Sequence, residues 1–155
     1  MKNRIVLGIL ILISVFIITG CENKKAFTIT CEGKKTDLEG IDITNKTIYN
    51  FGSDQIAIDY EVTSISIYES EEIYKAYKEY FVEESNNSTN EIEYNVKSNN
   101  KSKTINVNYK VKLPANKVNK MKDKDYYKAK KVLERAETDF KNKCTIEGIK
   151  RSELK

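Results

Sequence analysis

The sequence contains three cysteines, twenty-three Asp and Glu residues and no histidine. Histidine is the usual base beside a serine or cysteine nucleophile and a common metal ligand, so its absence excludes most familiar hydrolase mechanisms. The glycines are scattered and form no phosphate-binding loop, and Asp123-Lys124-Asp125 lacks the glycine and the final glutamate of a calcium loop. We therefore expect no metal site and no cofactor. The cysteines, carboxylates and tyrosines remain to be considered.

If Cys21 carries lipid, as argued below, Cys31 and Cys144 are the two cysteines that remain, and they can form a disulfide in a non-reducing compartment. They occur in the similar contexts TITCEG and NKCTIEG, within the first and last strands that the sequence predicts. A bond between them would close a loop of about 114 residues, which the chain-entropy model values at up to about 5 kcal/mol. The alternative is that both are small core residues with free thiols. No Cys-x-x-Cys spacing suggests a redox-active pair.

Cys21 follows a segment with the pattern of a secretory signal. Two basic residues precede an aliphatic run over residues 5–18, which at about 14 residues is shorter than the roughly 20 that cross a bilayer. The end of this segment, Ile18-Thr19-Gly20-Cys21, resembles the lipobox of bacterial lipoproteins. The resemblance implies that residues 1–20 are a cleaved signal peptide and that Cys21 carries a diacylglyceryl thioether. The alternative is an ordinary signal peptide with a chance cysteine.

Lipid on Cys21 predicts where the protein is located. Two or three acyl chains, such as palmitate, anchor a protein stably in a membrane, whereas one does so only marginally. Residues 21–25 would be the lipidated cysteine and a tether of about 15 Å, at roughly 3.5 Å per extended residue. Residues 26–155 suit a single domain. We expect a lipid-anchored protein on the extracytoplasmic side of the cell membrane.

Carboxylates offer the one catalytic alternative. Glycoside hydrolysis needs only two carboxyl groups about 5 to 10 Å apart, and glutamates such as Glu61, Glu69 and Glu72 could supply them. This alternative is a cell-wall-active hydrolase. A cleft containing two close glutamates would favour it, whereas a flat or grooved tyrosine-lysine surface without such a pair would favour a binding protein.

The charges are separated along the chain. Residues 69–93 carry eight glutamates and two lysines, whereas residues 97–131 carry twelve lysines and two aspartates. The basic stretch predicts an anionic lipid or wall polymer as a partner; nucleic acid is not expected for an exported protein. The alternative is a solvated lysine face that pairs with the acidic helix.

Tyrosines at helical spacing give a second candidate surface. Tyr74, Tyr77 and Tyr80, with Phe81, either cover the sheet as core residues, which is the favoured interpretation, or form an exposed patch that binds a sugar or a protein. The candidate binding residues are these tyrosines and three lysines from the basic stretch: Lys120, Lys122 and Lys124.

Alternating apolar residues predict six strands that carry these side chains. Their apolar positions are Phe27, Ile29 and Cys31; Ile41, Ile43, Tyr49 and Phe51; Ile56 to Val62; Ile92, Tyr94 and Val96; Ile105 to Val111; and Cys144 with Ile146. Ile65 and Ile67 have the opposite parity to Val62, which predicts a bulge near Thr63-Ser64.

Two helices complete the pattern. Ser70 with Glu71 and Glu72 predicts a helix start, and the helix should end at residues 85–88. A second stripe, over residues 123–142, is formed by Tyr126, Ala129, Leu133, Ala136 and Phe140. The predicted order is β-β-β-α-β-β-α-β, an α+β fold with an antiparallel sheet and both helices packed on one face.

The lipobox, the segment FTITCEGKK, the central helix and the strand pair EIEYNVKSNNKSKTINVNYKV resemble a family of small bacterial lipoproteins with a YehR-like domain of unknown function. The resemblance implies an α+β fold and an envelope location, and it implies no catalytic residues. We expect a membrane-anchored, non-catalytic binding or adaptor module of the cell envelope. Its partners would be the membrane, through Cys21, and an envelope protein or an anionic wall polymer.

Overall fold

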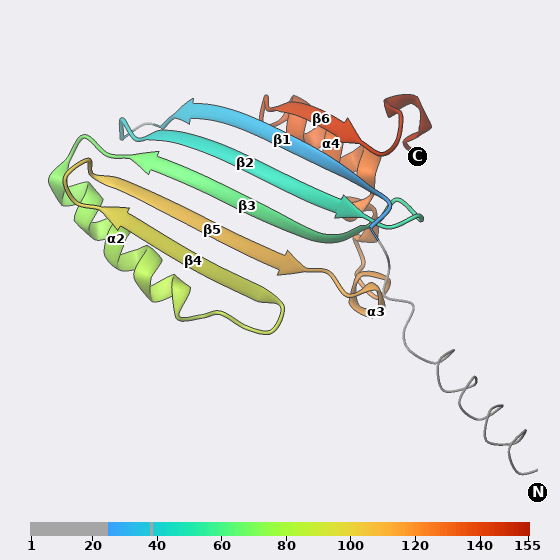
Figure 1. Cartoon of the computed structure of the whole chain (residues 1–155), viewed down its shortest axis with the longest axis horizontal. Coiled ribbons are helices and arrows are strands. Elements are labelled where there is room, and N and C mark those ends of the chain that lie inside the picture. The colour runs from blue at the N-terminus through green and yellow to red at the C-terminus, as the bar shows by residue number, and fades with distance from the viewer. Residues whose placement is uncertain (1–24, 38) are drawn as a thin grey trace, which may run out of the picture.

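The computed structural model describes residues 25–37 and 39–155, so Cys21 and the signal segment lie outside the described residues. Its centre is a six-stranded antiparallel sheet with the order β4-β5-β3-β2-β1-β6 (Figure 1). The strands are β1 (Phe27–Thr36), β2 (Asp42–Phe51), β3 (Ala57–Ile67), β4 (Ile92–Asn99), β5 (Thr104–Lys112) and β6 (Lys143–Glu147).

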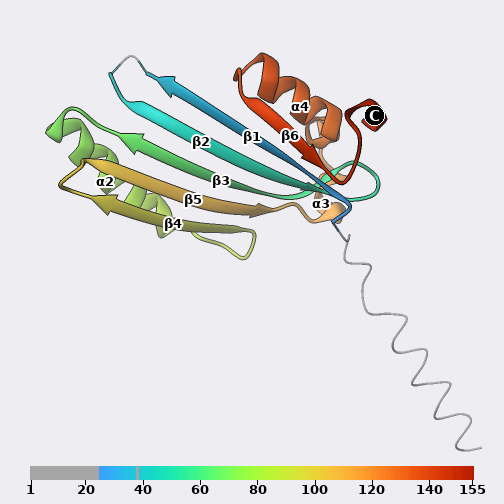
Figure 2. The same cartoon turned by 45° about the horizontal axis from the view of Figure 1, so that its top comes forward.

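Two main helices accompany the sheet, α2 (Glu71–Ser85) and α4 (Ala129–Thr138). Three shorter segments are α3 (Ala115–Val118) and the 3₁₀ helices η1 (Lys124–Tyr127) and η2 (Arg151–Glu153). The sequence pattern did not predict α3 and η2, whereas η1 falls within the helix predicted over residues 123–142. The predicted α+β class is confirmed (Figures 1 and 2). Within the described residues, no helix has the length and apolar character needed to span a membrane.

Strand register gives the sheet one apolar face and one polar face. A row of direct partners, Cys144, Cys31, Thr47, Val62 and Tyr109, crosses five strands on the same side. Because side chains alternate along a strand, the neighbours of these residues point to the other side, which carries mainly Thr, Asn and charged residues. We call the side with the cysteines the inner face. Both main helices pack on this face.

The predicted bulge near Thr63-Ser64 was wrong. The irregularity lies at Ile58, because Asn50 pairs with Asp59 whereas Phe51 pairs with Ala57. After it β3 runs in regular register, so Ile65 and Ile67 lie on the outer face and are 38% and 50% exposed. Isoleucine is favoured in strands by its branched side chain even where it is not buried, so its presence alone did not indicate the core side.

Helix α2 begins where the sequence predicts. The Ser70 hydroxyl accepts a hydrogen bond from the Ile73 amide at 3.3 Å, and two glutamates in the first turn interact favourably with the helix dipole. The helix packs on β4 and β5 through Tyr74, which is 1% exposed and lies in a cluster with Ile105 and Val107. The tyrosine interpretation as core is thus confirmed for Tyr74.

The helix predicted over residues 123–142 is interrupted. Lys128 has extended backbone angles and separates η1 from α4, and the segment ends by Asp139. Three residues of the predicted stripe, Ala129, Leu133 and Ala136, are on the buried side of α4. The other two, Tyr126 and Phe140, are 51% and 68% exposed. The break has a tertiary cause, since the bridge between Lys128 and Ile56 and the hydrogen bond from the Ala129 amide to the Gln55 carbonyl hold this point against the sheet.

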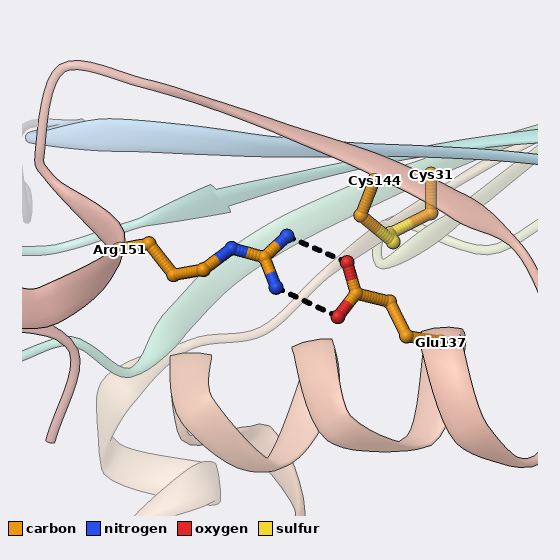
Figure 3. Close-up of a disulfide and its surroundings, with 4 residues drawn as sticks. All are labelled: Cys31, Glu137, Cys144 and Arg151. Atoms are coloured by element: carbon orange, nitrogen blue, oxygen red, sulfur yellow. Dashed lines mark hydrogen bonds and ion pairs between the residues drawn. A yellow bond between two sulfur atoms is a disulfide. The ribbon is translucent and has the colours of Figure 1, made fainter.

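The disulfide joins direct partners at the β1–β6 edge. Cys31 and Cys144 are opposite each other in the register, with Cα atoms 4.1 Å and sulfur atoms 2.08 Å apart. A bidentate ion pair lies beside the disulfide, with Arg151 Nη1 and Nη2 at 2.8 and 2.6 Å from the Glu137 carboxylate oxygens (Figure 3). The disulfide thus fixes β6 to β1, and the ion pair fixes η2 to α4.

Removal of this cross-link should lower stability. A chain from Glu22 onward with Cys31→Ser and Cys144→Ser is expected to lose about 2–5 kcal/mol of unfolding free energy, because its unfolded state is no longer restricted. Urea unfolding measures the loss, and wild type treated with dithiothreitol is the control that should match the variant. Thiol counting gives an independent check: two alkylatable thiols in the unreduced chain would disprove the disulfide.

Candidate functional site

The two main helices leave the middle of the inner face uncovered. Helix α2 packs against β4 and β5, whereas α4 contacts β1 and β6. Above β2 and β3, between the helices, lies an open groove of about 610 Å³. Side chains from both helices line it, including Phe81 of α2 and Val132 of α4. This groove is the candidate functional site.

Three tyrosines, Tyr49, Tyr60 and Tyr109, form what we call the tyrosine floor of the groove. Tyr49 and Tyr60 are direct partners across β2 and β3, with ring centroids 5.6 Å apart. Tyr109 follows diagonally on β5, its ring 6.4 Å from that of Tyr60 in an edge-to-face arrangement. Cross-strand aromatic pairs of this kind stabilise a sheet and also align the rings into one continuous surface.

Tyrosine is protonated at neutral pH, and partial burial moves the ionisation of the tyrosine floor to a still higher pH. Desolvation raises the pKa of Tyr60 to about 12, and the neighbouring Tyr109 adds to this effect. Desolvation is also the main cause of the raised pKa of Tyr49 and of Tyr109. No buried side-chain oxygen or nitrogen of the described residues lacks a hydrogen-bond partner. The floor is therefore neutral near pH 7 and presents phenol groups rather than phenolates to a ligand.

Arg135 on α4 forms the cationic wall of the groove. Its guanidinium carbon lies 3.3 Å from the centroid of the Tyr126 ring, and Nη2 donates a hydrogen bond to the Tyr126 carbonyl at 2.6 Å. The positive charge of Arg135 lowers the pKa of Tyr49, which partly offsets the larger rise in that pKa caused by desolvation. The arginine is thus held in place by stacking and by a hydrogen bond, and its charge is directed toward the floor.

The charge of the groove lining has a single sign. Lys35 of β1 joins Arg135 in the lining, whereas the strand register directs the neighbouring Lys34 to the outer face. None of the described Asp and Glu residues lines the groove. Amide and hydroxyl groups from Asn45, Ser64 and Asn142 also line the groove. The groove therefore combines aromatic rings, neutral hydrogen-bonding groups and cations. A ligand that matches all three has flat apolar faces, hydroxyl groups and negative charge.

Gly33 makes room for one of these polar groups. A Cβ atom at position 33 would lie 1.9 Å from Asn142 Oδ1, so the amide of Asn142 occupies the space above the β1 backbone. The φ angle of Gly33 is not positive, so the backbone conformation does not require a glycine here. Glycine is required because a larger residue would collide with Asn142. Sequence patterns did not indicate this contact, because the two residues lie far apart along the chain.

The glutamates considered for hydrolysis do not line the groove. Glu61 lies on the outer face, where its Oε1 accepts a hydrogen bond from Asn108 at 2.7 Å. Glu69 lies between β3 and α2, and Glu72 is in the first turn of α2. Among the described residues there is also no cluster of three His, Cys, Asp or Glu residues that could hold a metal ion.

The binding residues predicted from the sequence do not form one surface. Tyr74 is buried and its hydroxyl donates to Asn100 at 2.7 Å, Tyr77 is half-buried, and Tyr80 is 54% exposed on α2. The exposed lysines, Lys120, Lys122 and Lys124, lie between α3 and the start of α4, whereas α2 lies over the other part of the sheet (Figure 1).

The basic stretch pairs with the acidic stretch, but not through α2. Lys112 lies 3.1 Å from Glu93, and Lys117 contacts Glu91, so these contacts involve β4 and the residue before it. In the part of the chain that the structure describes, the α2 glutamates form no ion pair with residues 97–131. The described structure therefore does not show the lysines of the basic stretch pairing with the acidic helix.

The residues of the groove itself were missed as a site. Tyr49, Tyr60 and Tyr109 were assigned correctly to the apolar side of three strands, but sequence alternation does not show which apolar positions a helix leaves uncovered. Arg135 was not singled out, because its contacts with Tyr126 accompany a break at Lys128 where the sequence predicted a continuous helix. The one available signal was that large aromatic residues with a polar atom recur on one side of neighbouring strands.

Comparison with protein-family models, curated proteins and solved structures finds no match. The fold and the site alone therefore define the class: an α+β protein with a cationic, tyrosine-lined groove between two helices.

Stability should fall at alkaline pH because of Tyr60. Its phenol ionises near pH 10 in the unfolded chain but only at about pH 12 in the fold, so the unfolded state loses its proton first. Stability from this group is complete below about pH 10 and disappears as the pH approaches about 12. Urea midpoints across this range should decline less for Tyr60→Phe than for wild type; equal declines would contradict the assignment.

Proposed function

We propose that the protein is a lipid-anchored, non-catalytic binding module on the outer face of a bacterial cell membrane, and that its groove holds an anionic, sugar-containing wall polymer. The observation that carries this proposal is the composition of the groove: a tyrosine floor, the two cations Lys35 and Arg135, and no carboxylate from the described residues. The lipobox-like segment ending at Cys21 supports the location, as does the resemblance to YehR-like lipoproteins.

Sugar rings suit the tyrosine floor. Pyranose rings have flat C–H faces that pack on aromatic rings, and the floor offers three rings spaced 5.6 and 6.4 Å apart across neighbouring strands. Protonated phenols both donate and accept hydrogen bonds, which matches sugar hydroxyl groups. The open form of the groove suits a segment of a chain better than a small molecule that must be enclosed.

Negative charge on the polymer suits the rest of the lining. Arg135 can bind a carboxylate or phosphate with two parallel hydrogen bonds, and Lys35 adds positive charge. A carboxylate in the groove would repel such a ligand, and none of the described carboxylates lines it. The same lining gives no support to the alternative of a hydrolase that uses a carboxylate pair, because that mechanism needs two acids at the ligand.

Titration of the chain from Glu22 onward with a uronic acid oligosaccharide, its neutral counterpart and polyglycerol phosphate tests the proposal. The anionic sugar should bind most tightly, since it alone uses both the floor and the cations. Tyr60→Ala should weaken binding about tenfold through lost stacking, and Arg135→Gln about tenfold or more through a lost charged hydrogen bond. Isothermal titration calorimetry measures each affinity.

Matched controls separate the groove from the surface in general. Tyr80→Ala removes an exposed tyrosine outside the groove, and Lys97→Gln removes a cation on β4; both should bind like wild type. Some binding should survive high salt, because stacking is not screened. Equal losses in the control variants, or binding that disappears completely at high salt, would refute groove recognition.

A further inference from the structure

A lysine cluster lies at the end of the domain from which the tether leaves. The Ala26 amide donates to the Phe51 carbonyl at 2.7 Å, so Lys25 is placed at the end of β2. Helix α3 is at the same end, since Val118 packs into one core with Phe27 and Phe51. Figures 1 and 2 both show α3 beside the start of β1. The segment after α3 therefore emerges close to the tether.

This segment exposes three lysines around an apolar side chain. Lys120, Lys122 and Lys124 are exposed, and Met121 between them is 42% exposed. Their neighbours in sequence are paired: Lys117 contacts Glu91, and Lys128 lies 2.8 Å from Asp125. Within the described residues the three lysines have no ion-pair partner, and Asp123 is the only carboxylate among them. We call residues 120–124 the lysine end.

We infer that the lysine end docks on the anionic phospholipid headgroups of the membrane that holds the lipid anchor. This inference rests on the proposed lipidation of Cys21. Four residues, Glu22 to Lys25, separate Cys21 from Ala26, so this end of the domain stays within about 15 Å of the lipid. The headgroup potential extends over a Debye length of about 8 Å at physiological salt, which a short tether brings within reach of these lysines.

The composition of the lysine end favours headgroups over a soluble polyanion. Lysines flanking an exposed methionine match a headgroup layer with acyl chains beneath it, because the cations bind the surface while the thioether enters the interface. None of the three lysines lines the groove. Docking would thus fix the domain on the membrane at one end while the groove between α2 and α4 stays free for its ligand.

A single tryptophan can report this contact, since the natural chain contains none. The strands, both main helices and the disulfide that the structure describes lie within residues 25–155, so we expect the chain from Glu22 onward to keep the fold. In this chain Met121→Trp should show a blue shift of emission on vesicles of phosphatidylglycerol with phosphatidylcholine, and not on pure phosphatidylcholine. Tyr80→Trp, exposed on α2 away from α3, is the control that should show no shift.

Lysine substitutions then test the charge. Added to Met121→Trp, the triple change Lys120→Gln, Lys122→Gln and Lys124→Gln should weaken vesicle binding roughly a hundredfold, at about fivefold per lysine. The matched triple of Lys97→Gln, Lys101→Gln and Lys143→Gln removes the same charge from other exposed positions and should bind like the parent. Circular dichroism checks that both triples fold.

Four results would overturn the inference. Three concern the emission shift: no shift on anionic vesicles, an equal shift on pure phosphatidylcholine, and an equal shift with soluble polyphosphate in place of vesicles. Equal weakening by the two lysine triples would also overturn it, since net charge alone would then explain binding. Sugar titrations of the groove do not involve position 121, so failure of groove binding and failure of docking are distinguished.

Discussion

The antiparallel register of the sheet is the constraint on which the rest of the structure depends. Five strand pairings align every second residue into rows that cross the sheet, so one face is apolar from Cys144 on β6 to Tyr94 on β4. A slip of one residue in any pairing would move a strand's apolar set to the solvent side. The same rows put the two cysteines opposite each other and align the tyrosines.

Incomplete cover of that face creates the site. Each main helix has one apolar side and packs over one part of the sheet, α2 on β4 and β5 and α4 near β1 and β6. The strip between them carries tyrosines rather than isoleucines or leucines, and tyrosine tolerates such a position because its ring can be buried while its hydroxyl stays wet. Burial and access to a ligand are therefore compatible at the same residues.

Charge is arranged in separate regions of the fold. The groove contains cations without acids, the lysine end carries lysines without ion-pair partners among the described residues, and the glutamates at positions 91 and 93 pair with lysines beside β4. These regions lie on different elements, so two negatively charged partners could be held at once without competing for the same side chains. The proposed binding module on a short tether would use this separation, because the membrane and the wall polymer that we propose as its partners both carry negative charge.

Local sequence determined the strands, the start of α2 at Ser70 and the α+β class, because alternation and capping depend on residues that are close in the chain. It also indicated the pairing of Cys31 with Cys144, since only these two cysteines remain once Cys21 is assigned to lipid. Tertiary structure decided the rest. The break at Lys128 and the space that Asn142 occupies over Gly33 each depend on a contact between distant segments, and the bulge at Ile58 depends on how β2 pairs with β3. The groove was decided in the same way, since which tyrosines stay uncovered depends on where two helices lie, and that is set by packing across the whole inner face.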